Sequence, residues 1–187
     1  DNESYESSAG QQHLDFAVRW AHSLGDYDVG AYWFHGTNRD PIFSLAPQDS
    51  SSSAVQYSLQ QYYTQMDQLG IDVQATLGDW LWKFESIYRK TSIEDFWATQ
   101  GGFEYSFIGV FDTNIDLGFL MEHSWDSRGE VELGEQGSLL QNDLFLGARL
   151  AFNDMQSSEI LLGVGSDLDH NAYSFVIEAS RRFGDDF

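Results

Sequence analysis

The sequence has no cysteine, only two prolines, and nine lysines and arginines against 30 aspartates and glutamates, which gives a net charge of -21 over 187 residues. Without cysteine there is no disulfide framework, no thiolate metal cluster and no cysteine nucleophile. So few basic residues disfavour a nucleic-acid partner, because binding to phosphate groups depends on lysine and arginine. No run of 18 apolar residues occurs, and the mean hydropathy is -0.38, which excludes a transmembrane helix.

Aromatic residues and glycine are abundant instead. Aromatics make up 16% of the chain, and glycine occurs 17 times. A strongly acidic composition is common in disordered chains, but such chains are poor in aromatic residues. The length suits one ordinary domain. We therefore expect a folded chain whose aromatic residues occupy specific positions.

Polar stretches mark the expected start and the expected loops. Residues 1–12 are polar and acidic and lack the basic and apolar parts of a secretory signal, so we expect a polar N-terminal segment or loop of a mature form or a fragment. Residues 38–61 hold both prolines and a serine run, which predicts a long loop. A second long loop is expected over 126–141, where glycines recur. We expect the rest of the chain, 13–187, to form one β-stranded domain.

Apolar and polar residues alternate with period two along most of the chain. In one segment, Leu69, Ile71 and Val73 alternate with Gly70 and Asp72. Because successive residues of a strand point to opposite faces, this pattern predicts half-buried β-strands. About nine such segments occur, near residues 14–20, 28–36, 69–77, 80–89, 103–111, 115–122, 144–152, 160–165 and 173–182.

Short turns and longer connections follow one another between these segments. Glycine, asparagine and aspartate supply the positive φ that tight hairpins need. In an up-and-down meander, all short turns then lie at one end of the sheet and the longer loops at the other. Segment 28–36 has large residues on both parities, so its two faces stay unassigned. The short-turn signals are Gly25-Asp26, Gly78-Asp79, Asp112-Thr113-Asn114, Asn153-Asp154 and Gly184-Asp185.

One side of the alternation carries most of the charges in the strands, together with many glycines. Two interpretations stay open: a charged lumen that favours cations or polar solutes, and a cross-strand ion-pair network that fills a lumen. The expected pairs join Arg19, Lys83, Arg149 and Arg182 to acidic residues of neighbouring strands. The candidate lumen-lining charges are Arg19, Asp72, Lys83, Glu85, Glu104, Glu122, Arg149, Glu178 and Arg182.

The other side is aliphatic in the middle of the strands and aromatic at their ends. Two aromatic girdles around an aliphatic band are typical of an outer-membrane β-barrel, because aromatic rings suit the headgroup level of a bilayer. The alternative is a soluble lipocalin-like barrel or a sandwich. Candidate membrane-interface aromatics are Tyr27, Trp80, Phe111, Phe152 and Phe183 near the short turns, and Trp33, Tyr88, Trp125 and Tyr173 toward the long loops.

From about His13 onward the chain resembles porin-like β-barrel proteins of the Gram-negative outer membrane, as part of a larger outer-membrane protein. The resemblance implies an all-β, antiparallel up-and-down transmembrane β-barrel in the bacterial outer membrane, and it implies no activity. Such barrels close with an even strand number, so about nine visible strands predict part of a barrel with ten or more. The resemblance rests on residues 24–30, 67–72, 77–83, 102–105, 116–118, 142–147 and 178–182.

We expect a porin-like channel for passive passage of small polar or cationic solutes. Its expected partners are the lipid bilayer, lipopolysaccharide and small polar solutes. The alternative is a non-transporting barrel that acts as scaffold, sheath or receptor for a protein partner. We expect no enzyme and no cofactor, because no nucleophile elbow or paired-carboxylate motif occurs. We expect no metal site either, since the histidines share no ligand spacing: His13, His22, His35, His123 and His170.

Overall fold

The computed structural model describes residues 3–48, 56–128 and 141–184. Over these residues the chain is all-β, with twelve strands and one short 3-10 turn at Gly10–Gln12. The strands form two sheets, one of nine strands and one of three. No helix in the described part is long and apolar enough to cross a membrane.

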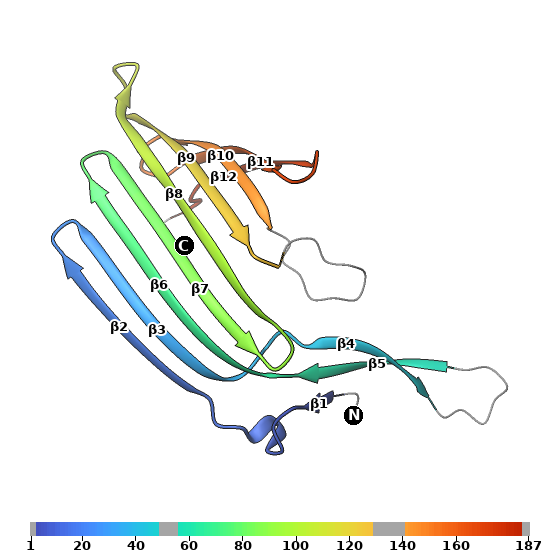
Figure 1. Ribbon diagram of the computed structural model, residues 1–187. Coiled ribbons are helices and arrows are strands. Elements are labelled where there is room, and N and C mark those ends of the chain that lie inside the picture. The colour runs from blue at the N-terminus through green and yellow to red at the C-terminus, as the bar shows by residue number, and fades with distance from the viewer. Residues whose placement is uncertain (1–2, 49–55, 129–140, 185–187) are drawn as a thin grey trace.

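The nine-stranded sheet is an antiparallel meander, so the expected number of strands and their antiparallel pairing are confirmed. Each strand pairs with its neighbour in the chain, except that β3 pairs with β6 across an inserted hairpin. Figure 1 shows the strands side by side in a curved sheet. They are β2 (Phe16–Leu24), β3 (Tyr27–Thr37), β6 (Gln65–Leu77), β7 (Trp80–Thr91), β8 (Asp95–Val110), β9 (Ile115–Asp126), β10 (Asn142–Ala151), β11 (Glu159–Asp167) and β12 (Tyr173–Ser180).

The three-stranded sheet corrects two loop expectations. Strands β4 (Ile42–Gln48) and β5 (Gln56–Tyr63) form a hairpin within and just beyond 38–61, and β1 (Glu3–Tyr5) pairs in parallel with β5. The prolines misled the loop prediction, because β4 is an edge strand and edge strands tolerate proline. In Figure 1 the hairpin extends away from the main sheet. Of the second expected loop, 126–141, residues 129–140 lie outside the described residues.

The tight turns lie where glycine, asparagine and aspartate predict them. Gly25 and Gly78 both adopt a φ of 63° between paired strands. Asp112 has a φ of 56° and Asn153 a φ of 50°, a conformation that these residue types tolerate better than most. The turns thus set the register of the hairpins they join. Gly184 has a φ of 85° after β12, and the residue that follows it lies outside the described residues.

The nine-stranded sheet is open. Its edges are β2 and β12, and they are not paired with each other. Because all neighbours in the sheet are antiparallel and the number of strands is odd, β2 and β12 run in the same direction. The described residues therefore form an open antiparallel meander and no closed barrel, so the expected all-β antiparallel fold is confirmed and the transmembrane barrel stays a prediction.

Within residues 3–48, 56–128 and 141–184, no second layer of protein packs against either face of the sheet. Among the described residues, the only buried apolar ones are Met66, Ala75 and Phe96. The chain exposes 13305 Å², whereas a compact folded monomer of 21.2 kDa exposes roughly 9,100 Å². The fold is thus a single-layer sheet whose two faces both meet the surroundings.

Aromatic rings lie over glycines of the neighbouring strand on the charged side of the sheet. A Cβ added at Gly70 would overlap the ring of Tyr32, and one added at Gly163 would overlap the ring of Phe145. Tyr32 is the cross-strand partner of Gly70. Glycine is therefore required at these positions so that the ring can lie flat on the strand backbone.

We predict that Gly70→Val lowers the free energy of unfolding by about 1–3 kcal/mol, because the new side chain displaces the Tyr32 ring. Adding Tyr32→Ala to this variant restores part of the loss, since it frees the space. The midpoints of urea unfolding measure both effects. Gln74→Val, on the same strand and the same face, is the matched control. Equal losses for Gly70→Val with and without Tyr32→Ala would contradict the overlap.

Candidate functional site

The register of the sheet assigns every strand residue to one of two faces, because cross-strand partners point to the same side. One row of partners crosses all nine strands and is apolar throughout. We call this side the apolar face and the opposite side the charged face. The row consists of Leu24, Tyr27, Ala75, Trp82, Phe103, Met121, Leu146, Val164 and Phe175.

The register also assigns the segment that the sequence left open. Val29 and Trp33 are partners of Val73 and Leu69, so they lie on the apolar face. Tyr32, one residue before Trp33, lies on the charged face over Gly70. The ring of Tyr32 on the charged face is therefore accommodated by a glycine of the next strand, which the local sequence pattern does not reveal.

Among the described residues, the apolar face carries exposed large side chains on both edge strands and in between. Val18 on β2 is 63% exposed, Ile71 on β6 is 48% exposed, and Ile177 on β12 is 80% exposed. Large apolar side chains that remain this exposed over a whole sheet indicate a surface made for an apolar environment or a partner.

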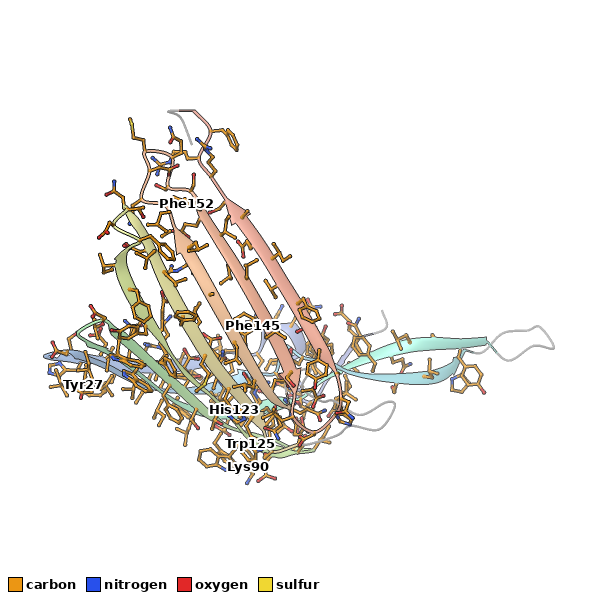
Figure 2. The ribbon with its side chains drawn as sticks, turned by 90° about the horizontal axis from the view of Figure 1, so that it is seen from above. Tyr27, Lys90, His123, Trp125, Phe145 and Phe152 are labelled. Carbon is orange, nitrogen blue, oxygen red and sulfur yellow. The ribbon has the colours of Figure 1, made fainter. Side chains whose placement is uncertain are left out.

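Aromatic residues gather at both ends of the apolar face. Figure 2 shows Tyr27 and Phe152 near one end of the strands and Trp125 near the other. Near the short turns, Trp80 stacks on Trp82 at 5.5 Å between ring centroids. Toward the long loops, Tyr88 contacts Trp97 at 4.9 Å.

The expected interface aromatics divide into strand and turn residues. Tyr27, Trp80, Trp33, Tyr88, Trp125 and Tyr173 lie in strands on the apolar face. Phe111 lies in the β8–β9 turn and is 88% exposed. Phe152 and Phe183 follow the ends of β10 and β12. Four further aromatics near the short turns also lie on the apolar face, although they are not among the expected interface aromatics: Trp82, Phe103, Tyr105 and Phe107.

Eight of the nine expected lumen charges lie together on the charged face. Arg182 is the exception: it follows the end of β12, and its backbone N–H donates to the carbonyl of Gln156. The pattern of alternation does not mark where the last strand ends, which explains the error. The eight are Arg19, Asp72, Lys83, Glu85, Glu104, Glu122, Arg149 and Glu178.

Arg19 and Arg149 do form ion pairs, but each pair spans an intervening strand, β3 or β9, and does not join neighbouring strands as expected. Arg19 Nη2 lies 2.8 Å from Asp72 Oδ1, and Arg149 donates to Glu104. Arg19 is 58% exposed, so its pair adds little to stability. The pairs neutralise two arginines on a face that is otherwise rich in carboxylates.

Arg128 and Arg89 form a cluster of contacts at the long-loop end of the charged face, which the sequence did not predict. Arg128 Nη2 lies 2.6 Å from Asp126 Oδ2, and its guanidinium carbon lies 3.7 Å from the ring centre of Phe96. Arg89 donates to Gln68 at 2.8 Å and to Asp40 at 3.1 Å. These residues come from five separate parts of the chain. The only hint of this cluster in the sequence is Phe96, an aromatic residue at a position of β8 that faces the charged side.

Asp15 connects the start of β2 to the end of β3. Its Oδ1 accepts the backbone N–H of Thr37 at 2.9 Å, and its carboxylate also contacts His13 and Arg39. The hydrogen bond from Thr37 is the main cause that holds the pKa of Asp15 below its usual value, against an opposing contribution from burial. The ionised form therefore stabilises the junction.

Neither face offers a metal centre within residues 3–48, 56–128 and 141–184, where no group of three or more histidine, aspartate or glutamate side chains could hold an ion. His123 instead contacts Asn142, with 3.0 Å between Nε2 and Oδ1. Comparison with protein-family models, with curated proteins and with solved structures finds no match to this chain.

We predict that Asp15→Asn makes the protein less sensitive to acid. The folded-state pKa of Asp15 lies below its ordinary value of about 4, so its stabilisation is present above pH 4 and is lost as the pH falls through the folded-state pKa. Wild type should thus exceed Asp15→Asn in unfolding midpoint at pH 7, and the gap should close toward pH 2. Parallel pH profiles for the two proteins would refute this role.

Proposed function

We propose that the nine-stranded sheet forms most of the wall of a transmembrane β-barrel in a bacterial outer membrane, and that this barrel is a porin-like channel for small polar or cationic solutes. One observation carries the proposal: the apolar face runs across all nine strands, between two groups of aromatic residues, and is backed by a charged face. Lipid-facing and lumen-facing residues alternate in this way along the strands of such barrels.

The exposure of the apolar face supports a lipid environment. Removing about 1,000 Å² of apolar surface from water is worth roughly 25 kcal/mol, which exceeds the net stability of about 5–15 kcal/mol typical of a protein. A sheet whose apolar side chains stay as exposed as Ile177, at 80%, therefore has to be covered. The aromatic groups at both ends favour a bilayer, because tryptophan and tyrosine concentrate at its two interfaces.

The direction of the two edge strands determines how a barrel could close. Since β2 and β12 run in the same direction, pairing them directly would create a parallel seam. Bacterial barrels consist of antiparallel strands in even number. In our proposal an odd number of further strands lies between β12 and β2. If there is only one added strand, it runs antiparallel to both edge strands.

The charged face supports a preference for cations. Its acidic side chains outnumber its basic ones, and Arg19 and Arg149 are each held by a carboxylate. Acidic side chains around a lumen favour cations and disfavour anions. The acidic residues of this face are Asp28, Asp72, Glu85, Glu104, Asp116, Glu122, Asp126, Asp143, Glu159, Asp167 and Glu178.

A non-transporting barrel that holds a protein partner is the second candidate. The projecting hairpin favours it, because one side of that hairpin carries four exposed apolar residues: Phe43, Leu45, Tyr57 and Leu59. Exposed apolar patches on a protruding element are typical of protein interaction sites. Co-purification of a stoichiometric protein partner, lost when these residues become serine, would favour this candidate over the channel.

We predict unitary, cation-selective conductance when the purified protein is added to planar bilayers. In Glu85→Gln/Glu122→Gln the ratio of cation to anion permeability should fall by about twofold or more, since two carboxylates leave the lumen. Asp67→Asn/Asp95→Asn is the matched control, because both residues have the parity of the apolar face, and its selectivity should equal that of wild type. Absence of unitary conductance would overturn the channel proposal.

We predict that cysteines placed on the two edge strands do not form a disulfide with each other. The chain has no cysteine of its own, so pairs such as Ala21→Cys with Val176→Cys report only on the edges. One intervening strand separates them by roughly 9–10 Å, too far for a disulfide. Ala148→Cys with Leu162→Cys, which are cross-strand partners, is the positive control. An edge-to-edge disulfide, within one chain or between two, would refute closure by added strands.

A further inference from the structure

A hollow lies in the charged face where β7, β8 and β9 run side by side, and its volume is about 210 Å³. Two rows of cross-strand partners on the charged face form its walls. The row between them has the opposite parity, so it contributes its backbone as the floor. The wall rows are Glu85, Gln100 and Ser124 on one side and Ile87, Ala98 and Asp126 on the other, and the floor row is Ser86, Thr99 and Trp125.

Small side chains keep the hollow open, and an ion pair closes its long-loop side. Ala98 separates Ile87 from Asp126 in the wall nearer the long loops. Asp126 is only 4% exposed, and Arg128 donates Nε to its Oδ1 at 2.9 Å and Nη2 to its Oδ2 at 2.6 Å. This wall therefore presents the hydrocarbon of Ile87 and Ala98, while its one carboxylate is committed to an arginine.

Glu85, in the opposite wall, is the carboxylate that stays available. It is exposed on β7, and no hydrogen bond or ion pair engages it within the part of the chain that the structure describes. Its cross-strand neighbour Asp72 is held by Arg19 at 2.8 Å. Lys83, two residues away on the same face of β7, forms no ion pair with Glu85. Glu85 is thus a negative charge that a ligand can reach and neutralise.

Gln100 and Ser124 add two neutral oxygens to this wall. Gln100 donates its Nε2 to Glu122 Oε2 at 3.4 Å, which leaves its own Oε1 as an acceptor. Ser124 is the next cross-strand partner, and a hydroxyl can accept as well as donate. Because cross-strand neighbours have Cβ atoms about 5 Å apart, these oxygens and the carboxylate of Glu85 line one side of the hollow together.

We propose that this hollow binds a small primary amine as its ammonium ion. The ammonium group donates to Glu85 and Gln100, and its short hydrocarbon body lies against Ile87 and Ala98. The assignment rests on the proposed function, which makes the charged face the wall of a lumen, and it names the class of cationic solute that this lumen retains.

The chemistry of the two walls selects this class of ligand. An ammonium group has three N–H donors and no acceptor, which matches a wall of acceptors, and its hydrogen bonds to a carboxylate are stronger than those between neutral groups. A quaternary ammonium ion has the same charge but no N–H to donate. An anion would meet Glu85 with like charge. The ligand is smaller than a typical drug-sized molecule, because the hollow holds only about 210 Å³.

An NMR titration of the full chain in detergent micelles tests the proposal, with n-butylammonium as the probe and tetramethylammonium as its control of equal charge. The backbone amide signals of Ala98, Gln100 and Ser124 should shift and saturate with n-butylammonium. Tetramethylammonium should bind about tenfold more weakly, a ratio that corresponds to about 1.4 kcal/mol. Two variants should each weaken n-butylammonium binding by about tenfold: Glu85→Gln, which removes the charge, and Ala98→Leu, which fills the hollow.

Each variant has a matched control on the same face outside the hollow. Glu178→Gln removes a carboxylate on β12, and Ala21→Leu enlarges an alanine on β2. Both controls should bind n-butylammonium like wild type. Glu85→Gln changes an exposed side chain, so it still tests the site if Ala98→Leu fails to fold.

The outcomes separate this site from the channel. Equal binding of the two ions, or equal losses in Glu85→Gln and Glu178→Gln, would reveal only a general attraction of cations to carboxylates and would overturn the site. Specific binding without unitary conductance in planar bilayers would overturn the channel and support the site. Unitary conductance without saturable shifts would do the reverse.

Discussion

The constraint on which the structure depends is that a single layer of strands exposes both of its faces. A two-layer protein hides its apolar residues between layers, but here the described chain has almost no buried apolar side chain. Each face must then match its own surroundings. The apolar row from Leu24 to Phe175 suits apolar surroundings, and the charged residues on the opposite face suit water.

Local signals explain what could be predicted from the sequence. Residues 69–77 alternate cleanly and end at Gly78, so both the strand and its turn follow from neighbouring residues alone. The pairing of β1 with β5 depends instead on contacts nearly sixty residues apart, such as the stacking of Tyr5 on Tyr63. No periodicity within either segment encodes such a contact. The hairpin of β4 and β5 was missed because prolines outweighed a short alternation.

The same distinction between local pattern and long-range pairing applies to the candidate site. Parity alone assigned Asp72 and Glu104 to the charged face, since the face follows from counting residues along a strand. Parity failed at Tyr32, whose position depends on the absence of a side chain at Gly70 on the next strand. Counting does not apply to Arg128, which lies beyond the end of β9 and contacts Asp126 and Phe96 only once the sheet has formed. Features created by pairing are invisible before the pairing is known.

Strand direction also restricts how copies of the chain could assemble. In the proposed membrane barrel, two copies inserted in the same orientation would be related by an axis along the membrane normal, which keeps all four edge strands pointing the same way. Every seam between β12 of one copy and β2 of the other would then be parallel. Turning one copy over makes the seams antiparallel, but it moves its long connections to the opposite side of the bilayer. An odd number of antiparallel strands inserted between β12 and β2 avoids both conflicts, which is why the edges of this sheet suit an added strand better than a second copy.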